Sequence, residues 1–137
     1  MIFIDNSVRY SVYYPDSAEE FARLIPDGGT TVRLPSETDA DNEEVHTVAL
    51  FHQLYCLGLI RADYAANQST ALSEHCMNYL RQVLLCAADT KLESVRAEHP
   101  PNIVTLAGDY ECRDWSVVYK AAEANQRNWY EQSRRQA

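Results

Sequence analysis

The feature that most constrains the fold of this chain is a repeated segment that carries a cysteine. The residues FHQLYCLGLIR at 51–61 return in altered form as SEHCMNYLR at 73–81, with Cys56 aligned to Cys76. In both copies a ring-bearing side chain precedes the cysteine, an apolar residue follows it, and an arginine stands five residues after it. Because apolar residues recur at helical spacing through both copies, the repeat predicts two helices that pack as an antiparallel pair.

The repeat also predicts which side chains face the partner helix. On an α-helix, the residues at positions i, i+3 and i+4 lie on one face. In the two copies these positions hold His52, Tyr55 and Cys56, and then Leu72, His75 and Cys76. Since equivalent residues of such a pair meet near a pseudo-twofold axis, we expect a disulfide between Cys56 and Cys76. We also expect Arg61 and Arg81 to act as equivalents, each reaching a carboxylate or carbonyl at the far end of its own helix.

The remaining sequence predicts one further long helix and a few short elements. We expect strands at 8–14 and 30–34, a short helix that starts in a capping box of Ser17 and Glu20, a solvated acidic loop at 36–44 and an extended piece at 102–110. The predicted long helices span 45–66, 71–92 and 114–134. Together these elements predict a mainly α fold in one domain over 1–137, with a small β and loop region at 1–44 and a helical region at 45–134.

Charge and composition exclude some classes of partner. The formal net charge of −8 argues against binding to nucleic acid or to an anionic membrane surface, because neither gains from an acidic partner. No apolar run approaches the ~18–20 residues of a membrane span, so the chain as given is expected to be soluble. The four cysteines show no CxxC spacing, which leaves a zinc ribbon unsupported. A second disulfide between Cys86 and Cys112 is our preferred pairing, although four buried thiols would fit the count almost as well.

Three blocks of the chain resemble a known family. FHQLYCLGLIR, HCMNYLRQVLLCAADTKLE and GDYECRDWSVVYKAAE, which lie between about residues 45 and 124, are similar to the UstYa-like proteins of fungal mycotoxin biosynthesis. The hallmark of that family is a pair of H-x-x-H-C motifs. The resemblance implies a domain in the secretory-pathway lumen, anchored by an amino-terminal membrane span. It also implies tailoring of peptides and other natural products, notably by oxidative cyclisation, with copper held by the motif histidines.

The motifs are incomplete in this chain. By the resemblance, His52 and Cys56 belong to the first motif, and His75 with Cys76 belongs to the second. Tyr55 and Leu72 stand where the family has its other two histidines, so the ligand set is halved. We therefore expect no cofactor, with copper on His52 and His75 as the alternative, because a leucine offers a metal no donor atom.

The preferred hypothesis is a tailoring enzyme that cyclises or isomerises a small metabolite or short peptide by proton transfer. His52 and His75 would be the acid and base, and Tyr55 would orient the substrate in a groove between the two motif helices. Further candidate substrate contacts are Tyr79, Gln53, Gln82 and Asp89. One alternative is a copper-dependent oxidative cyclase or dehydrogenase. A second alternative is a non-catalytic partner of an active paralogue, and a homodimer or a complex with a paralogue would suit either type of protein.

Overall fold

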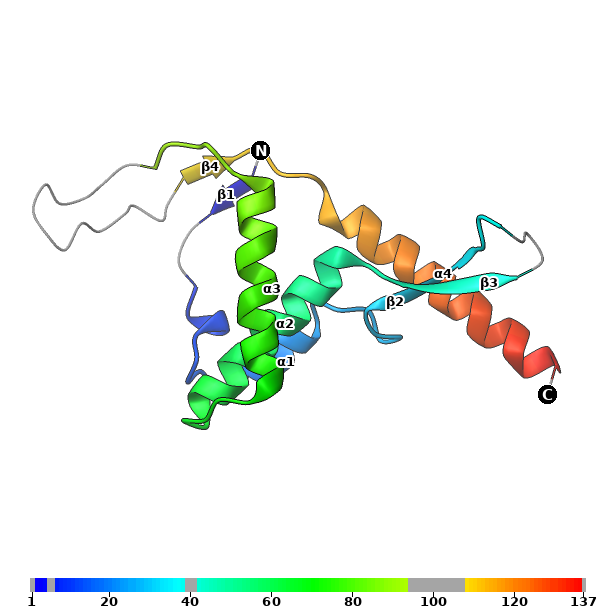
Figure 1. Cartoon of the computed structure of the whole chain (residues 1–137), viewed down its shortest axis with the longest axis horizontal. Helices are drawn as coiled ribbons and strands as arrows, with labels where there is room; N and C mark the ends of the chain where they lie inside the picture. The colour runs from blue at the N-terminus through cyan, green and yellow to red at the C-terminus, as the bar shows by residue number, and fades with distance from the viewer. Residues whose placement is uncertain (1, 5–6, 39–41, 94–107, 137) are drawn as a thin grey trace, which may run out of the picture.

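The fold contains three long helices, of which two form a hairpin and the third leads away from it. The computed structural model describes residues 2–4, 7–38, 42–93 and 108–136. Its α-helices are α1 (Ser17–Ala22), α2 (Ala49–Ala65), α3 (Ala71–Ala87) and α4 (Trp115–Gln136), and a 3₁₀ turn, η1, covers Val8–Tyr10. In Figure 1, α2 and α3 run side by side in opposite directions, while α4 leads away to the C-terminus. The mainly α fold with three long helices and an antiparallel motif-bearing pair is thus confirmed.

A disulfide and a polar loop hold the α2–α3 hairpin together. Cys56 and Cys76 are bonded, their Cα atoms are 5.0 Å apart, and the two residues are 0% and 1% exposed. The predicted pairing of these cysteines is therefore confirmed. At the start of α3, Thr70 accepts a hydrogen bond from the backbone N–H of Ser73, and the Ser73 hydroxyl in turn accepts one from the backbone N–H of Thr70. This reciprocal cap satisfies two of the N–H groups that a helix start leaves free.

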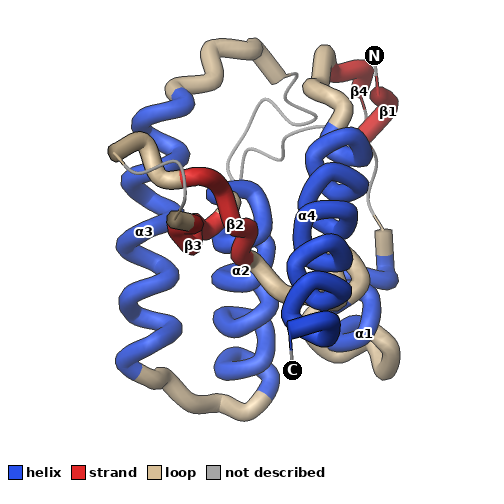
Figure 2. The backbone as a smooth tube through the Cα atoms, turned by 90° about the vertical axis from the view of Figure 1, so that its right-hand side faces the viewer, coloured by secondary structure: helices blue, strands red, loops and turns tan. Residues whose placement is uncertain are grey.

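Two small antiparallel sheets complete the fold. Strand β2 (Thr31–Pro35) pairs with β3 (Glu43–Thr47), and β1 (Ile2–Ile4) pairs with β4 (Gly108–Tyr110). Figure 2 shows the β2–β3 ribbon beside α4. Asn125 of α4 joins the two, because its side-chain oxygen accepts from the Arg33 N–H at 2.8 Å while its side-chain nitrogen donates to the Arg33 carbonyl at 2.7 Å. The amide thus completes the backbone hydrogen bonding of β2 as a further strand would.

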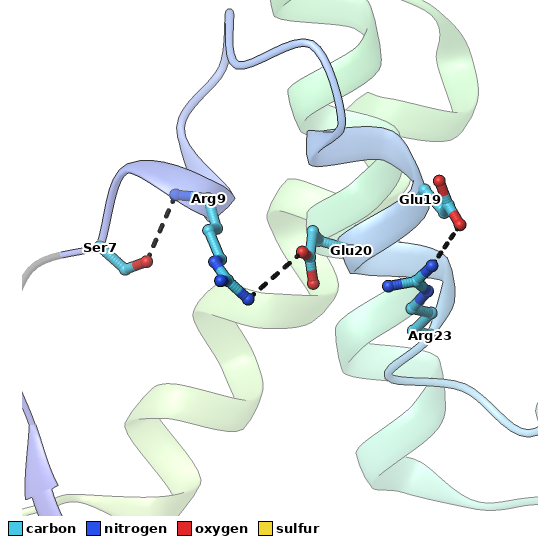
Figure 3. A network of polar contacts seen from close by, with 5 residues as sticks. All are labelled: Ser7, Arg9, Glu19, Glu20 and Arg23. Carbon is cyan, nitrogen blue, oxygen red and sulfur yellow. Dashed lines mark hydrogen bonds and ion pairs between the residues drawn. The ribbon is translucent and has the colours of Figure 1, made fainter.

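The amino-terminal segment differs from its prediction. Residues 8–14 do not form the expected strand; the turn η1 covers Val8–Tyr10 instead, with the Ser7 side chain accepting from the Arg9 N–H. Figure 3 shows the ion pair, 3.7 Å long, that links Arg9 to Glu20 of α1. The expected capping box of α1 is also wrong: Asp16 is the N-cap without a side-chain hydrogen bond, and the Ser17 hydroxyl is buried with no partner among the described residues. Local hydrogen bonds and the packing onto α1 overrule the alternating pattern of residues 8–14.

Several other element boundaries also need correction. Residues 43–47 belong to strand β3 rather than to an acidic loop and a helix start, because they pair with the predicted strand at 30–34. Helix α2 consequently begins at Ala49, and α3 ends at Ala87 because Ala88 adopts a left-handed φ of 43°. Of the extended piece at 102–110, residues 102–107 lie outside the described residues, and the remainder forms β4. No helix in the described part of the chain combines the length and apolarity that crossing a bilayer requires.

Candidate functional site

Three aromatic rings gather on the α2–α3 hairpin, close to the disulfide. His52 comes from α2, one turn before Cys56, while His75 and Tyr79 of α3 flank Cys76 in sequence. The ring centroids of His52 and Tyr79 are 4.2 Å apart and those of His52 and His75 are 6.4 Å apart, both with planes inclined by 26°. The disulfide joins the two helices close to all three rings. His52 and Tyr79 lie within one helical turn of a bonded cysteine, and His75 is the neighbour of Cys76 in sequence. We call His52, His75 and Tyr79 the ring cluster.

Exposure distinguishes the two histidines of the ring cluster. His52 and Tyr79 are half-buried, whereas His75 is exposed. An imidazole passes protons in the neutral pH range, which is the usual basis of its acid–base chemistry. The more enclosed imidazole of His52 therefore has an exposed imidazole beside it.

The donor set of the ring cluster does not fit a complete copper centre. Copper(II) prefers several nitrogen or oxygen donors in a square or tetragonal arrangement. In the part of the chain that the structure describes, no group of three or more histidine, cysteine, aspartate or glutamate side chains converges on a point. Cys56 and Cys76 are consumed by their disulfide, and Leu72 brings only a hydrocarbon side chain to its place in the repeat. The cluster contributes two imidazoles and a phenol.

Tyr55 lies apart from the ring cluster. It is 46% exposed and lines a hollow between α1 and α2 together with Phe21 and Arg61. The ring that stacks on His52 belongs instead to Tyr79, which the sequence placed only among the substrate contacts. The helical spacing of His75 and Tyr79, four residues apart on one face of α3, was the available signal for this arrangement. The catalytic roles of His52, His75 and Tyr55 stay predictions.

The remaining candidates are dispersed. Gln82 is exposed and follows Tyr79 by three residues, so it extends the ring-cluster face of α3, and Gln53 is half-buried on α2. Asp89 lies beyond α3 and accepts a hydrogen bond from the Lys91 backbone N–H at 2.9 Å, which is a local turn contact. Of these three candidates only Gln82 extends the ring-cluster face of α3, and all three stay predicted substrate contacts.

The second predicted disulfide is absent. Cys86 and Cys112, both within the described residues, are free and exposed. Cys86 lies in the last turn of α3, whereas Cys112 follows β4, whose backbone is tied to β1. Cys112 Sγ donates to the Tyr110 carbonyl at 3.8 Å instead of being bonded to Cys86.

The most strongly bonded polar group of the hairpin is Asp63, which sequence reasoning missed. Its carboxylate is buried, with the residue 8% exposed, and it accepts from the Thr70 hydroxyl at 2.7 Å, the Thr70 N–H at 2.9 Å and the Gln68 side chain at 3.1 Å. Hydrogen bonds from Ser73 and Thr70 lower the pKa of Asp63 from 3.8 to about 2. Asp63 therefore fixes the α2–α3 loop as an anion.

The sequence of this chain matches a known protein family. Residues 17–129 match the family described as "Mycotoxin biosynthesis protein UstYa". The chain is 35% identical to the UstYa family oxidase phomYb of Diaporthe leptostromiformis, over 79% of this chain and 50% of that protein. It is 33% identical to oxidase ustYa of Aspergillus flavus, over 67% of this chain and 48% of that protein. Oxidase ustYb of the same fungus is 28% identical, over 66% of this chain and 47% of that protein.

The chain spans about half the length of the curated relatives that it matches. No solved structure matches it.

Proposed function

The chain belongs to the UstYa family of mycotoxin biosynthesis proteins, and on that premise we propose that it is an oxidative tailoring enzyme of fungal natural-product biosynthesis. The observation that carries the proposal is that the three relatives are each named as oxidases. The substrate is a small metabolite or a short peptide. Two hydrogens leave it, a ring or a double bond forms, and dioxygen takes up both electrons and, with two protons from solvent, becomes hydrogen peroxide. The oxidative alternative from the sequence is thereby preferred to the non-redox one.

The ring cluster supplies the proton transfers of this reaction. His52 is the more enclosed imidazole and is held in place by its stacking on Tyr79, so it takes the proton that leaves the substrate. His75 is exposed at a ring distance of 6.4 Å and passes that proton on to solvent. The order of the two histidines follows from their exposure.

A non-redox cyclase or isomerase is the second candidate function. The observation that favours it is the donor set, because two imidazoles suffice for acid–base catalysis but do not complete a copper centre. In that case the ring cluster would perform the whole reaction. Oxygen consumption separates the two candidates, since only the oxidase requires it.

The experiment uses the full-length protein and the metabolite that accumulates in a strain lacking its gene. His52→Ala and His75→Ala should each lower the rate of conversion by the ~10²- to 10⁴-fold typical of a lost general acid or base. His46→Ala is the matched control, because His46 is an exposed histidine on β3, outside the ring cluster. Unchanged conversion by both cluster variants would contradict the proposed site and would favour a non-catalytic partner of a paralogue.

A further inference from the structure

A hollow lined by apolar side chains lies between α1 and α2, on the side of α2 that carries Tyr55. Its volume is about 240 Å³. The apolar side chains that line it are Ala18, Phe21, Ala22, Ile25, Leu54 and Leu59. Tyr55 and Arg61 contribute the polar groups, and Gly58 lies between them on α2. The wall is thus hydrocarbon, with a phenol and a guanidinium along one edge.

Arg61 is the unmatched charge of this hollow. Its Nη1 donates to the Val12 carbonyl at 3.2 Å, and its Nε is buried with no hydrogen-bond partner in the described residues. No carboxylate of the described chain forms an ion pair with it. The buried Nε is closed to a ligand, but the two Nη groups carry four of the five N–H donors of a guanidinium, and the Val12 carbonyl takes only one of them, so an anion can accept from the others. Arg81, its counterpart in the repeat, is exposed and bonds to Asn78 in its own helix, so the expected equivalence of the two arginines is wrong.

Gly58 keeps the hollow open. A Cβ at this position would lie 3.8 Å from the Cβ of Phe21, which is an ordinary contact, so a small side chain fits and a larger one would extend into the hollow. Tyr55 and Arg61 are six residues apart on α2, which corresponds to about 9 Å along the helix axis. Gly58 thus lies between two residues that bring a phenol and a guanidinium to the same stretch of α2.

We propose that this hollow binds a carboxylate attached to an apolar body, with the carboxylate on the Arg61 guanidinium and an aromatic or branched side chain over Gly58. The ligand class is the carboxyl-terminal residue of a short apolar peptide. Its role as the anchor of a substrate rests on the proposed function, since the peptide would extend past Tyr55 toward His52, which precedes Tyr55 by one helical turn. The binding itself requires no turnover.

The test measures binding of N-acetyl-phenylalanine to the full-length protein by titration calorimetry, with N-acetyl-phenylalaninamide as the neutral control. We expect the acid to bind at least about tenfold more tightly than the amide, a difference typical of one charged hydrogen-bonded pair. Arg61→Met should remove that preference, and Arg81→Met, the matched arginine of the second copy, should retain it. Equal binding of acid and amide, or no binding of the acid, would overturn the proposal.

A second pair of variants tests the hollow without altering Arg61. Gly58→Leu should block binding of the acid, whereas Gly58→Ala should retain it and leave the helix intact. Undiminished binding by a folded Gly58→Leu variant would place the ligand elsewhere and refute the assignment. These titrations do not depend on conversion of a substrate. If the acid binds but the protein oxidises no substrate, the binding proposal stands and the proposed function fails. If the protein oxidises its substrate but the acid does not bind, the proposed function stands and the binding proposal fails.

Discussion

Removing the Cys56–Cys76 disulfide, by replacing both cysteines with alanine, should lower the free energy of unfolding by about 3 kcal/mol. The bond closes a loop with a sequence separation of 20, and the chain entropy that it withholds from the unfolded state corresponds to about that value. Both residues are almost completely buried, so the loss of sulfur contacts in the folded state acts in the same direction. The assay is guanidinium chloride unfolding without reductant, followed by far-ultraviolet circular dichroism.

The matched control replaces Cys86 and Cys112 with alanine. Both are free and exposed, so their loss should change the free energy of unfolding by no more than about 0.5 kcal/mol. A reductant should destabilise this control as much as the wild type, and both should approach the variant that lacks Cys56 and Cys76. Two results would refute the claim that only the Cys56–Cys76 bond stabilises the fold. One is a loss of less than about 1 kcal/mol when Cys56 and Cys76 are replaced, and the other is an equal loss when Cys86 and Cys112 are replaced.

Two further predictions concern residues that fix the hairpin and the β2–β3 ribbon. Because the pKa of Asp63 is lowered, its hydrogen bonds stabilise the fold above pH 3.8 and cease to do so as the pH falls through about 2. The difference in free energy of unfolding between the wild type and Asp63→Asn, measured by urea unfolding, should therefore narrow from pH 5 to pH 2. A difference that does not change with pH would contradict this. Asn125→Ala leaves the Arg33 N–H and carbonyl without their partner on α4 and should lower the free energy of unfolding, measured by thermal unfolding, by about 1–3 kcal/mol. Asn128 is exposed on the same helix, so Asn128→Ala should change the free energy of unfolding hardly at all. Equal losses in the two variants would show that the Asn125 amide contacts contribute little.

The helix hairpin could be predicted because its determinants are local and repeated. The helical spacing around Cys56 and Cys76 fixes two faces, and the equivalence of the two copies then places one cysteine against the other. Strand β3 could not be found in this way, since its first residues are acidic and become a strand only by pairing with Thr31–Pro35. The failed strand at 8–14 shows the converse case, an alternating pattern with no paired strand in the described structure.

The site was predictable in part, for a related reason. The motif spacing predicts that the two histidines come together. His52 and Tyr55 are three residues apart, however, and therefore differ by about 60° around the helix, which is enough to place their side chains against different neighbouring helices. Tyr55 consequently lines the hollow against α1, and Tyr79 from the other helix stacks on His52. The anchoring role of Asp63 depends on the path of the loop that carries Gln68 and Thr70, which no local pattern specifies.

The most direct test of the proposed oxidation is the mass of the product. The full-length protein would be incubated in air with the metabolite that accumulates in the deletion strain, and the product would be analysed by high-resolution mass spectrometry. The account predicts a product two hydrogens lighter than the substrate, no product when oxygen is excluded, and a large loss of rate in His52→Ala but not in His46→Ala. A product of unchanged mass that forms equally well without oxygen would contradict the oxidase assignment and establish the acid–base cyclase or isomerase instead.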